Sequence, residues 1–197
     1  MRAFPTQPQL LVGDTVRLEP LQPSHCQALQ AAVQDGQLWQ VWCTVIPEPE
    51  QMAQEIERRL ALQAAGSMLP YVVVSVPENR VVGMTSYMNI DASVPRVEIG
   101  STWYAASAQR TGVNTQAKTL LLTHAFESLG CHVVELTTHF LNQKSRRAIA
   151  RLAAKLDGVL RNHTRMRDGP LGYTCVYRIV AAEFRADKMQ LLPLLNR

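Results

Sequence analysis

The stretch from Val97 to Gly130, VEIGSTWYAASAQRTGVNTQAKTLLLTHAFESLG, changes its pattern in the middle. Its first part, within 96–104, is typical of a strand, and 109–114 form a short loop that contains a glycine. From Val113 onward the period is helical, and Gly130 is the residue type that ends helices. Backbone N–H groups and the helix dipole at such a junction attract anions, so we expect a phosphate group to bind there. Taken alone, an ordinary strand-to-helix turn explains the pattern equally well.

Working outward, the chain predicts strands and helices in mixed order. The expected strands are 14–19, 71–76, 81–90, 96–104, 131–138, 158–165 and 173–180. The expected helices are 23–33, 47–66, 113–129, one that begins at Asn142, and 181–195. The helix from Asn142 is expected to have Ile149, Leu152 and Leu156 on one face. Strand–helix alternation is confined to the middle, which predicts a mixed α/β fold with a mainly antiparallel sheet. The unit 96–138 should be a right-handed crossover, giving a central parallel strand pair flanked by helices.

Length and composition indicate one globular domain over 1–197, with 47% hydrophobic and 18% charged residues. No apolar run approaches the roughly 20 residues that span a bilayer, and the N-terminus does not have the pattern of a signal peptide, so we expect no membrane partner. The four cysteines lie far apart without a CxxC pair. We therefore expect no metal site and no disulfide framework, and a reduced, cytoplasmic protein.

The positive charge is concentrated in one segment. The net charge is +4, yet residues 142–168 carry +6 and the remainder carries −2. Such a patch favours an anionic partner, either a phosphorylated cofactor or nucleic acid. Aromatic residues are not interleaved with these bases and no nucleic-acid-binding motif is evident, which argues against nucleic acid. A merely solvated polar face stays open as an explanation.

Together these motifs resemble the GNAT superfamily of N-acetyltransferases, and within it the RimJ/RimL branch that acetylates ribosomal-protein N-termini. The superfamily's pyrophosphate loop, Gln/Arg-x-x-Gly-x-Gly/Ala, is matched by Gln109–Asn114. The branch's Glu-Ile-Gly strand is matched by Glu98–Gly100, its Asn-x-x-Ser helix start by Asn142–Ser145, and its Gly-Val-Leu-Arg strand by Gly158–Arg161. The resemblance covers about residues 10–184. Two positions depart from it: Asn114 stands where Gly or Ala is usual, and Ala153 stands where Gly is usual.

The resemblance implies a GNAT fold and an enzyme that uses acetyl-CoA without a metal. It places acetyl-CoA on residues of the loop and of the later helix start: Gln109, Arg110, Thr111, Gly112, Val113, Asn114 and Asn142. It also implies that Glu98 is a general base, direct or through water, and that Ser145 donates to the CoA thiolate. A structural carboxylate at Glu98 and a capping serine at Ser145 stay open as alternatives. Asn114 would either crowd the pyrophosphate or donate to it.

The acceptor is expected to be a primary amine, on a protein N-terminus or a small molecule. It should bind between the first two helices and the last two strands, where five aromatic residues are candidates for its lining or for the core: Trp39, Trp42, Tyr87, Trp103 and Tyr104. Modification of an antibiotic or toxin amine, and a non-catalytic CoA-binding sensor or RNA-associated domain, are the alternatives. Nucleic acid enters only indirectly through the ribosome, and a homodimer stays open.

Overall fold

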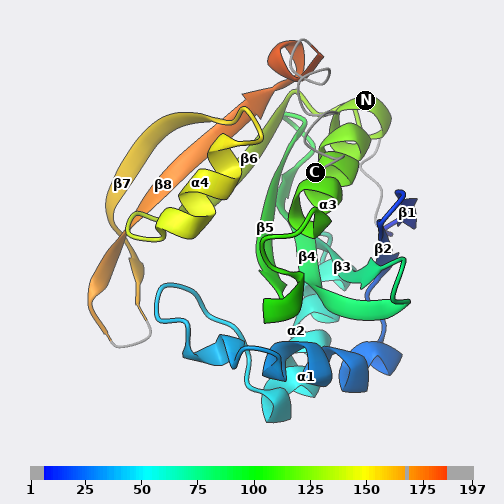
Figure 1. The fold of residues 1–197 in the computed structure, drawn as a ribbon. Coiled ribbons are helices and arrows are strands. Elements are labelled where there is room, and N and C mark those ends of the chain that lie inside the picture. Colours follow the sequence, from blue (N-terminus) through cyan, green and yellow to red (C-terminus); the bar gives the residue numbers. More distant parts are fainter. Residues whose placement is uncertain (1–6, 167–168, 186–197) are drawn as a thin grey trace.

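The computed structural model describes residues 7–166 and 169–185, which form one open eight-stranded sheet with helices on both faces (Figure 1). The strand order is β1-β2-β3-β4-β5-β6-β8-β7, and all described neighbours are antiparallel except the parallel pair β5–β6. This confirms the expected mixed fold and its central parallel pair. The strands are β1 (Leu11–Val12), β2 (Val16–Pro20), β3 (Met68–Ser75), β4 (Arg80–Asp91), β5 (Arg96–Tyr104), β6 (Val133–His139), β7 (Lys155–Arg165) and β8 (Leu171–Val180).

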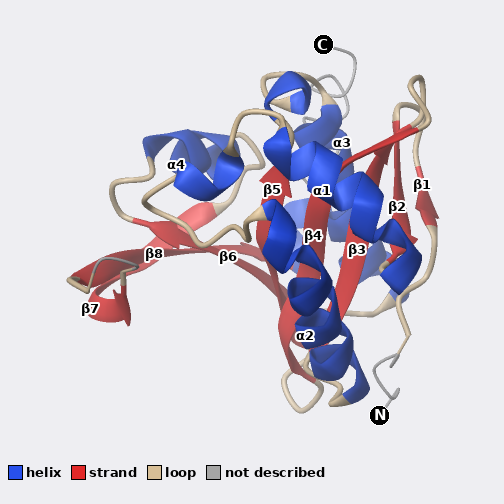
Figure 2. Cartoon of the chain, turned by 90° about the horizontal axis from the view of Figure 1, so that it is seen from below, coloured by secondary structure: helices blue, strands red, loops and turns tan. Residues whose placement is uncertain are grey.

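The helices lie on two faces of the sheet (Figure 2). They are α1 (Cys26–Gln34), α2 (Met52–Ala64), α3 (Val113–Thr123) and α4 (Gln143–Ala150), with short turns η1 (Pro23–His25), η2 (Leu38–Gln40), η3 (Pro49–Gln51), η4 (Ala106–Ala108) and η5 (His124–Ser128). Two consecutive residues of β4 show the division: Thr85 contacts α3, whereas Ser86 contacts α2. Successive strand residues point to opposite faces, so α2 and α3 cover opposite sides.

Coverage on both faces explains why β3 is buried along its whole length. Tyr71 of β3 and Tyr87 of β4 are fully buried and meet edge to face, with their ring centroids 6.1 Å apart. The Tyr87 hydroxyl donates to the Leu121 carbonyl of α3 over 2.5 Å. Tyr87, a candidate for the acceptor lining, is therefore a core residue that ties α3 to the sheet.

The predicted helix after Asn142 is shorter than expected. It ends at Ala150, and Leu156, expected on its buried face, lies in β7 with 46% of its surface exposed. Ala153 has φ = +61°, in the left-handed region. That conformation suits glycine, which explains both the end of the helix and the residue type usual at this position in the branch.

Other helices also differ from the prediction in their ends or in their buried residues. The helix predicted for 113–129 is α-helical only to Thr123 and continues as the π-turn η5, although Gly130 ends it with φ = +70° as expected. The buried face of α2 also holds Arg59, and Leu60 packs against the core as expected, whereas Ala64 is exposed. Of the terminal helix predicted for 181–195, residues 181–185 are helical and 186–197 lie outside the described residues.

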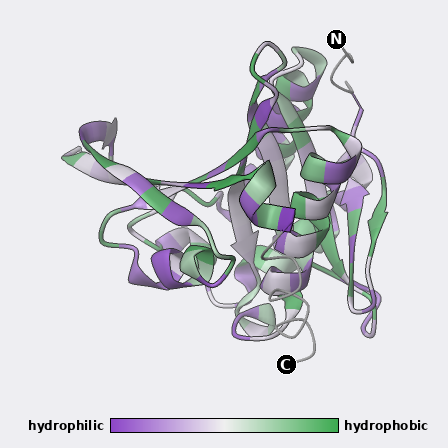
Figure 3. Cartoon of the chain, turned by 90° about the horizontal axis from the view of Figure 1, so that it is seen from above, coloured by the Kyte–Doolittle hydropathy of each residue, from purple (hydrophilic) through white to green (hydrophobic). Residues whose placement is uncertain are grey.

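Strands β6, β8 and β7 extend away from the rest of the sheet as an arm, with α4 beside them (Figures 1 and 2). Along this arm hydrophobic and hydrophilic residues alternate, while α4 is mainly hydrophilic (Figure 3). Within residues 7–166 and 169–185, no helix has the length and apolar character needed to cross a membrane.

Candidate functional site

A cavity of about 1260 Å³ opens where β5 and β6 separate. The two strands pair only from Arg96 to Glu98 on β5 and from Val133 to Glu135 on β6. Beyond these residues, 99–104 and 136–139 face each other across the cavity. A bulge in β5 accompanies the separation, because the β4–β5 register slips by one residue and Ser101 adopts φ = +49°.

The loop predicted to bind phosphate forms one end of this cavity. Gln109 donates from Nε2 to the Tyr104 carbonyl over 2.9 Å, and Thr111 donates from Oγ1 to the Ala108 carbonyl over 2.7 Å. These bonds hold the loop so that α3 begins at the cavity wall, where its first backbone N–H groups lack helical partners. Five of the six loop residues line the cavity: Gln109, Arg110, Thr111, Gly112 and Asn114.

Gly112, at the start of α3, has no protein atom in the space that a side chain would occupy. It has ordinary helical φ of −68°, so its backbone conformation does not require glycine. A Cβ placed there meets no atom within 4 Å. The absent side chain therefore leaves room for a ligand rather than for another part of the protein. Val113, the sixth loop residue, is not in the cavity lining and packs against the hydrophobic core.

The start of α4 forms the opposite wall. Asn142 stands at the start of the helix as predicted, and it caps the helix because its Oδ1 accepts from the Ser145 backbone N–H over 3.1 Å. Both residues line the cavity, as do Lys144, Arg147 and Arg151 of the basic segment. Arg146 instead donates to the Tyr177 hydroxyl and the Phe140 carbonyl, both over 3.1 Å.

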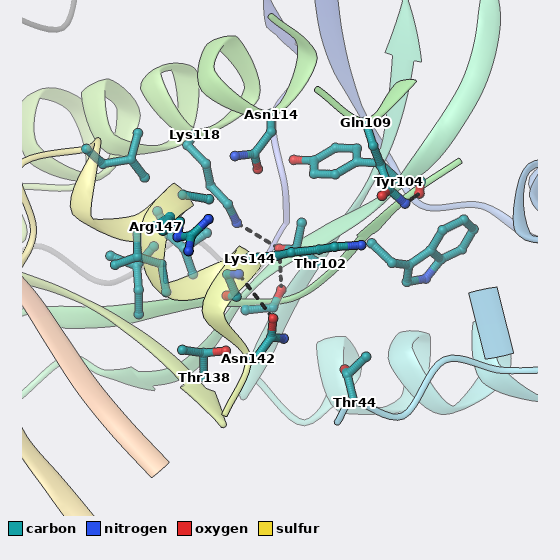
Figure 4. A pocket seen from close by; sticks show the side chains of 18 of the residues that line it. Thr44, Thr102, Tyr104, Gln109, Asn114, Lys118, Thr138, Asn142, Lys144 and Arg147 are labelled. Atoms are coloured by element: carbon teal, nitrogen blue, oxygen red, sulfur yellow. Dashed lines mark hydrogen bonds between the residues drawn. The ribbon is translucent and has the colours of Figure 1, made fainter. Parts of the chain in front are cut away.

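The charged side chains among the described lining residues of the cavity are all basic. Six basic residues line it, and among the described lining residues none is acidic; the bases are Arg59, Arg110, Lys118, Lys144, Arg147 and Arg151. Figure 4 shows three of these bases, Lys118, Lys144 and Arg147, together with the polar side chains of Asn114, Asn142 and Gln109. A surface of this kind, ending at a helix N-terminus, favours an elongated ligand with several phosphate groups.

Glu98 lies at the point where β5 and β6 separate, but it does not line the cavity. It is 6% exposed, and both carboxylate oxygens accept hydrogen bonds over 2.6 Å, from Asn89 Nδ2 and from Thr137 Oγ1. A Cβ at Gly100 would approach Glu98 Oε1 to 3.3 Å and Met88 Sδ to 2.7 Å. The Glu-Ile-Gly motif therefore has a packing reason as well, because Gly100 makes room for the Met88 side chain and for the carboxylate.

Two buried cations in the cavity wall were missed by the sequence reasoning. Arg59 of α2 is 3% exposed and donates to Glu55 Oε1 over 2.6 Å and to the Ser101 carbonyl over 3.2 Å. Lys118 of α3 is 6% exposed and donates to Thr102 Oγ1 over 2.7 Å. Both could have been found by helical spacing, because Arg59 follows buried Ile56 by three positions and Lys118 precedes buried Leu121 and Leu122 by three and four.

A second, apolar pocket of about 420 Å³ lies next to the first. Its lining comes from the loop before α2, the end of β6 and the β7–β8 hairpin: Trp42, His139, Phe140, Leu141, Met166, Pro170, Leu171, Gly172 and Tyr173. Trp42 meets the His139 ring edge-on at 5.5 Å, and His139 lines both pockets. Of the other aromatic candidates, Trp103 and Tyr104 line the larger cavity, while Trp39 packs against the core.

The four cysteines are all unpaired. Cys131 and Cys175 are buried. Burial raises the pKa of Cys131 to about 12, and it also raises the pKa of Cys43, which lines the larger cavity. Within the described residues no cluster of His, Cys, Asp and Glu could hold a metal ion.

Comparisons with known proteins agree with this geometry. A family model described as Acetyltransferase (GNAT) domain matches residues 15–155. A search of curated proteins gave no match. Among solved structures, an acetyltransferase from T. thermophilus is 28% identical, with a TM-score of 0.83, over 99% of this chain and 100% of that one. Mycobacterium smegmatis RimJ in complex with CoA-disulfide is 21% identical (TM-score 0.84; 99% and 98% covered). A Salmonella typhimurium acetyltransferase that modifies the N-terminal serine of ribosomal protein L7/L12 is 20% identical (TM-score 0.78; 87% and 99%).

Proposed function

Since this chain belongs to the GNAT acetyltransferase family, we propose that it transfers the acetyl group of acetyl-CoA directly to a primary amine, and that the amine is the α-amino group of a protein or peptide. The observation that carries the proposal is the cavity between β5 and β6, which joins the N-terminus of α3 to a basic wall. The proposal treats 1–197 as one catalytic domain that works in a reducing, cytoplasmic setting.

Acetyl-CoA supplies a thioester, and the protein binds its charged end. We assign the pyrophosphate to the backbone N–H groups from Gly112 to Thr115, because the helix dipole adds positive potential there. Gln109, Arg110 and Thr111 stand beside these groups, and Asn114 faces the cavity from the first turn of α3. Lys144 and Arg147 of α4 supply further positive charge from the facing wall. Val113 contributes only its backbone, since its side chain packs inward.

The reaction requires a neutral amine, an oxyanion site and a proton for the departing thiolate. A peptide α-amino group has a pKa of about 7.7–8.0, so it needs less help than a lysine near 10.4. Backbone N–H groups at the β5 bulge can meet the oxyanion, and Arg59 fixes that bulge through the Ser101 carbonyl. Ser145 lines the cavity and is proposed as the donor to the thiolate.

Glu98 is proposed to assist removal of the amine proton through an intermediary. Its two oxygens are already occupied and it stands behind the cavity wall, so direct contact with the amine is not supported by its position. Replacing Glu98 by Gln should lower kcat by about 10²–10⁴-fold and leave acetyl-CoA affinity nearly unchanged. Steady-state kinetics and calorimetry measure the two quantities, and a loss below tenfold would assign Glu98 to structure alone.

The apolar pocket supports a peptide acceptor. It borders the cavity through His139, and Trp42 of its lining is 54% exposed. We propose that the first side chains of the acceptor rest there while the amine enters the cavity. A solved structure of similar fold, the Salmonella typhimurium enzyme that modifies the N-terminal serine of a ribosomal protein, favours the same class of substrate, a protein N-terminus. The test is acetyl transfer from acetyl-CoA to a panel of peptides with free N-termini, with Nα-blocked peptides as controls and aminoglycosides and polyamines as competing acceptors.

A further inference from the structure

Lys118 lines the cavity but has no task in the reaction described so far. It lies in the middle of α3 and reaches toward β5 (Figure 4). Its Nζ lies 2.7 Å from Thr102 Oγ1 and 3.4 Å from Thr85 Oγ1, and these two hydroxyl oxygens are 2.8 Å apart. Both contacts are neutral. Within the described part of the chain no carboxylate lies within ion-pair distance of Nζ, although the residue is 6% exposed.

Burial and one charged neighbour determine the ionisation of Lys118. From α2 and α4 the cavity presents Arg59, Lys144 and Arg147, all cations, and the Tyr104 hydroxyl on β5 is uncharged. Glu98, also on β5, is the one charge that favours a protonated Lys118. Burial outweighs it and lowers the pKa of Lys118 from 10.5 to about 7. Near neutral pH the amine therefore exists in both forms, whereas an ordinary lysine is almost wholly charged.

We propose that Lys118 accepts the proton of the attacking amine and passes it on to the CoA thiolate. This inference rests on the acetyl transfer proposed above and names the group that moves its proton. It also gives Glu98 a role it can perform from behind the cavity wall: its negative charge keeps Lys118 basic enough to accept a proton. Glu98 is then a positioning residue that acts through Lys118.

The proton balance closes without any other reactant. The acceptor nitrogen bonds to the thioester carbon, the carbonyl electron pair moves to oxygen, and the nitrogen becomes positively charged. Lys118 Nζ takes one proton from this nitrogen, directly or through one water molecule. The oxygen pair then re-forms the carbonyl, the carbon–sulfur bond breaks, and the thiolate receives the proton from Lys118, with the Ser145 hydroxyl as its hydrogen-bond donor. The enzyme ends as it began, and the amine proton resides on sulfur.

The pKa order supports the transfer of the proton from Lys118 to the thiolate. An alkyl thiol of the cysteine type has a pKa of about 8.5, so transfer from a Lys118 ammonium near 7 to the thiolate is downhill. An ordinary lysine near 10.4 would hold the proton too tightly and would be charged before the reaction began. The neutral hydroxyl contacts from Thr85 and Thr102 suit this exchange, because each hydroxyl oxygen accepts from Nζ in either state and a hydroxyl can also donate to Nζ when the amine is neutral.

Two substitutions separate proton exchange from a structural role. Lys118→Met keeps the length and removes the amine, and Lys118→Arg keeps the charge but cannot release a proton near neutral pH. Both should lower kcat by about 10²–10⁴-fold for a peptide acceptor that wild type uses, with acetyl-CoA affinity changed less than threefold. Lys155→Met is the matched control, because Lys155 lies on β7 with its side chain 67% exposed, and it should keep wild-type kcat.

The pH profile is the readout that a merely structural role would not move. In wild type at saturating acceptor, kcat should rise with a midpoint near 7, and Glu98→Gln should move this midpoint downward because it removes the charge that favours protonated Lys118. NMR titration of lysines labelled at Cε, with CoA bound and no acceptor, should show one resonance with a midpoint near 7 that is missing in Lys118→Met.

Three results would overturn the inference: kcat of Lys118→Met within fivefold of wild type, recovery of activity in Lys118→Arg, or a Lys118 resonance that titrates near 10. If wild type transfers acetyl to no amine, the proposed function fails instead. The two failures are therefore distinguishable, because the inference is judged on the variants of an active enzyme and on the titration.

Discussion

Replacing Lys118 with Met should make the protein more stable near neutral pH, although it removes a buried hydrogen bond. In the unfolded chain the lysine has its ordinary pKa of 10.5, and in the folded chain burial lowers this to about 7. Above pH 10.5 both states are neutral and the group has no effect on folding. As pH falls through the window from 10.5 to 7, the unfolded chain gains a proton that the folded chain does not, so stability is lost.

The size of the effect follows from the shift. Each pKa unit corresponds to about 1.4 kcal/mol, so the 10.5-to-7 shift costs up to about 5 kcal/mol at and below pH 7. Lys118→Met removes that cost and loses the bond to Thr102, which contributes about 1–1.5 kcal/mol. Thr102 and Thr85 remain hydrogen-bonded to each other. The expected net gain at pH 7 is about 2–4 kcal/mol.

Urea unfolding of wild type and Lys118→Met at several pH values measures this difference. Subtracting the two curves cancels Tyr71, Tyr87, Tyr104 and Cys131, whose raised pKa values act alike in both proteins. The advantage of the variant should shrink by about 3 kcal/mol between pH 7 and pH 9.5. A variant less stable than wild type at pH 7, or a difference independent of pH, would refute the idea that Lys118 is held neutral by burial.

Three further predictions concern the cofactor loop, the end of α4 and the order of transfer. Gly112→Val should weaken acetyl-CoA binding by about tenfold or more in calorimetry while the melting temperature stays unchanged, because the added Cβ meets no protein atom within 4 Å; wild-type affinity would remove the loop from the site. Ala153→Gly should stabilise the protein by about 0.5–1 kcal/mol in urea unfolding, since φ there is +61°, and no gain would show that this conformation is unstrained. Intact mass measurement after incubation with acetyl-CoA and no acceptor should show no stoichiometric adduct, because burial raises the pKa values of Cys43 and Cys131; an adduct on cysteine that transfers to an added amine would contradict direct transfer.

Local patterns predicted much of the fold correctly, because local backbone preferences decided it. Asn142 caps α4, Gly130 ends the helix that begins at Val113, and the loop from Gln109 to Asn114 joins β5 to α3 as expected. The error at Leu156 has a physical cause. An apolar residue at helical spacing indicates a helix only if the backbone continues, and the left-handed Ala153 breaks it three residues earlier.

The site was harder to predict because it depends on contacts between distant segments. Glu98 was predicted as a site residue from its strand motif. Its position behind the cavity wall depends on hydrogen bonds from Asn89 and Thr137, which are nine and 39 positions away in the chain. Lys118 lies in a turn of α3 that belongs to none of the recognised motifs. It is buried against Thr102 because α3 packs on the sheet, and this contact cannot be derived from the local sequence. A cation on the buried face of a helix is the sequence signal that could have identified it.

Following the acetyl group tests the proposed reaction most directly. Purified protein would be incubated with isotopically labelled acetyl-CoA and a panel of peptides with free N-termini, and tandem mass spectrometry would locate the label. We expect label on the α-amino nitrogen of at least one peptide, stoichiometric release of CoA, and none of this with Nα-blocked peptides. Tight binding of acetyl-CoA without transfer to any peptide amine would contradict the proposed reaction, because it would leave the cavity between β5 and β6 as a binding site alone.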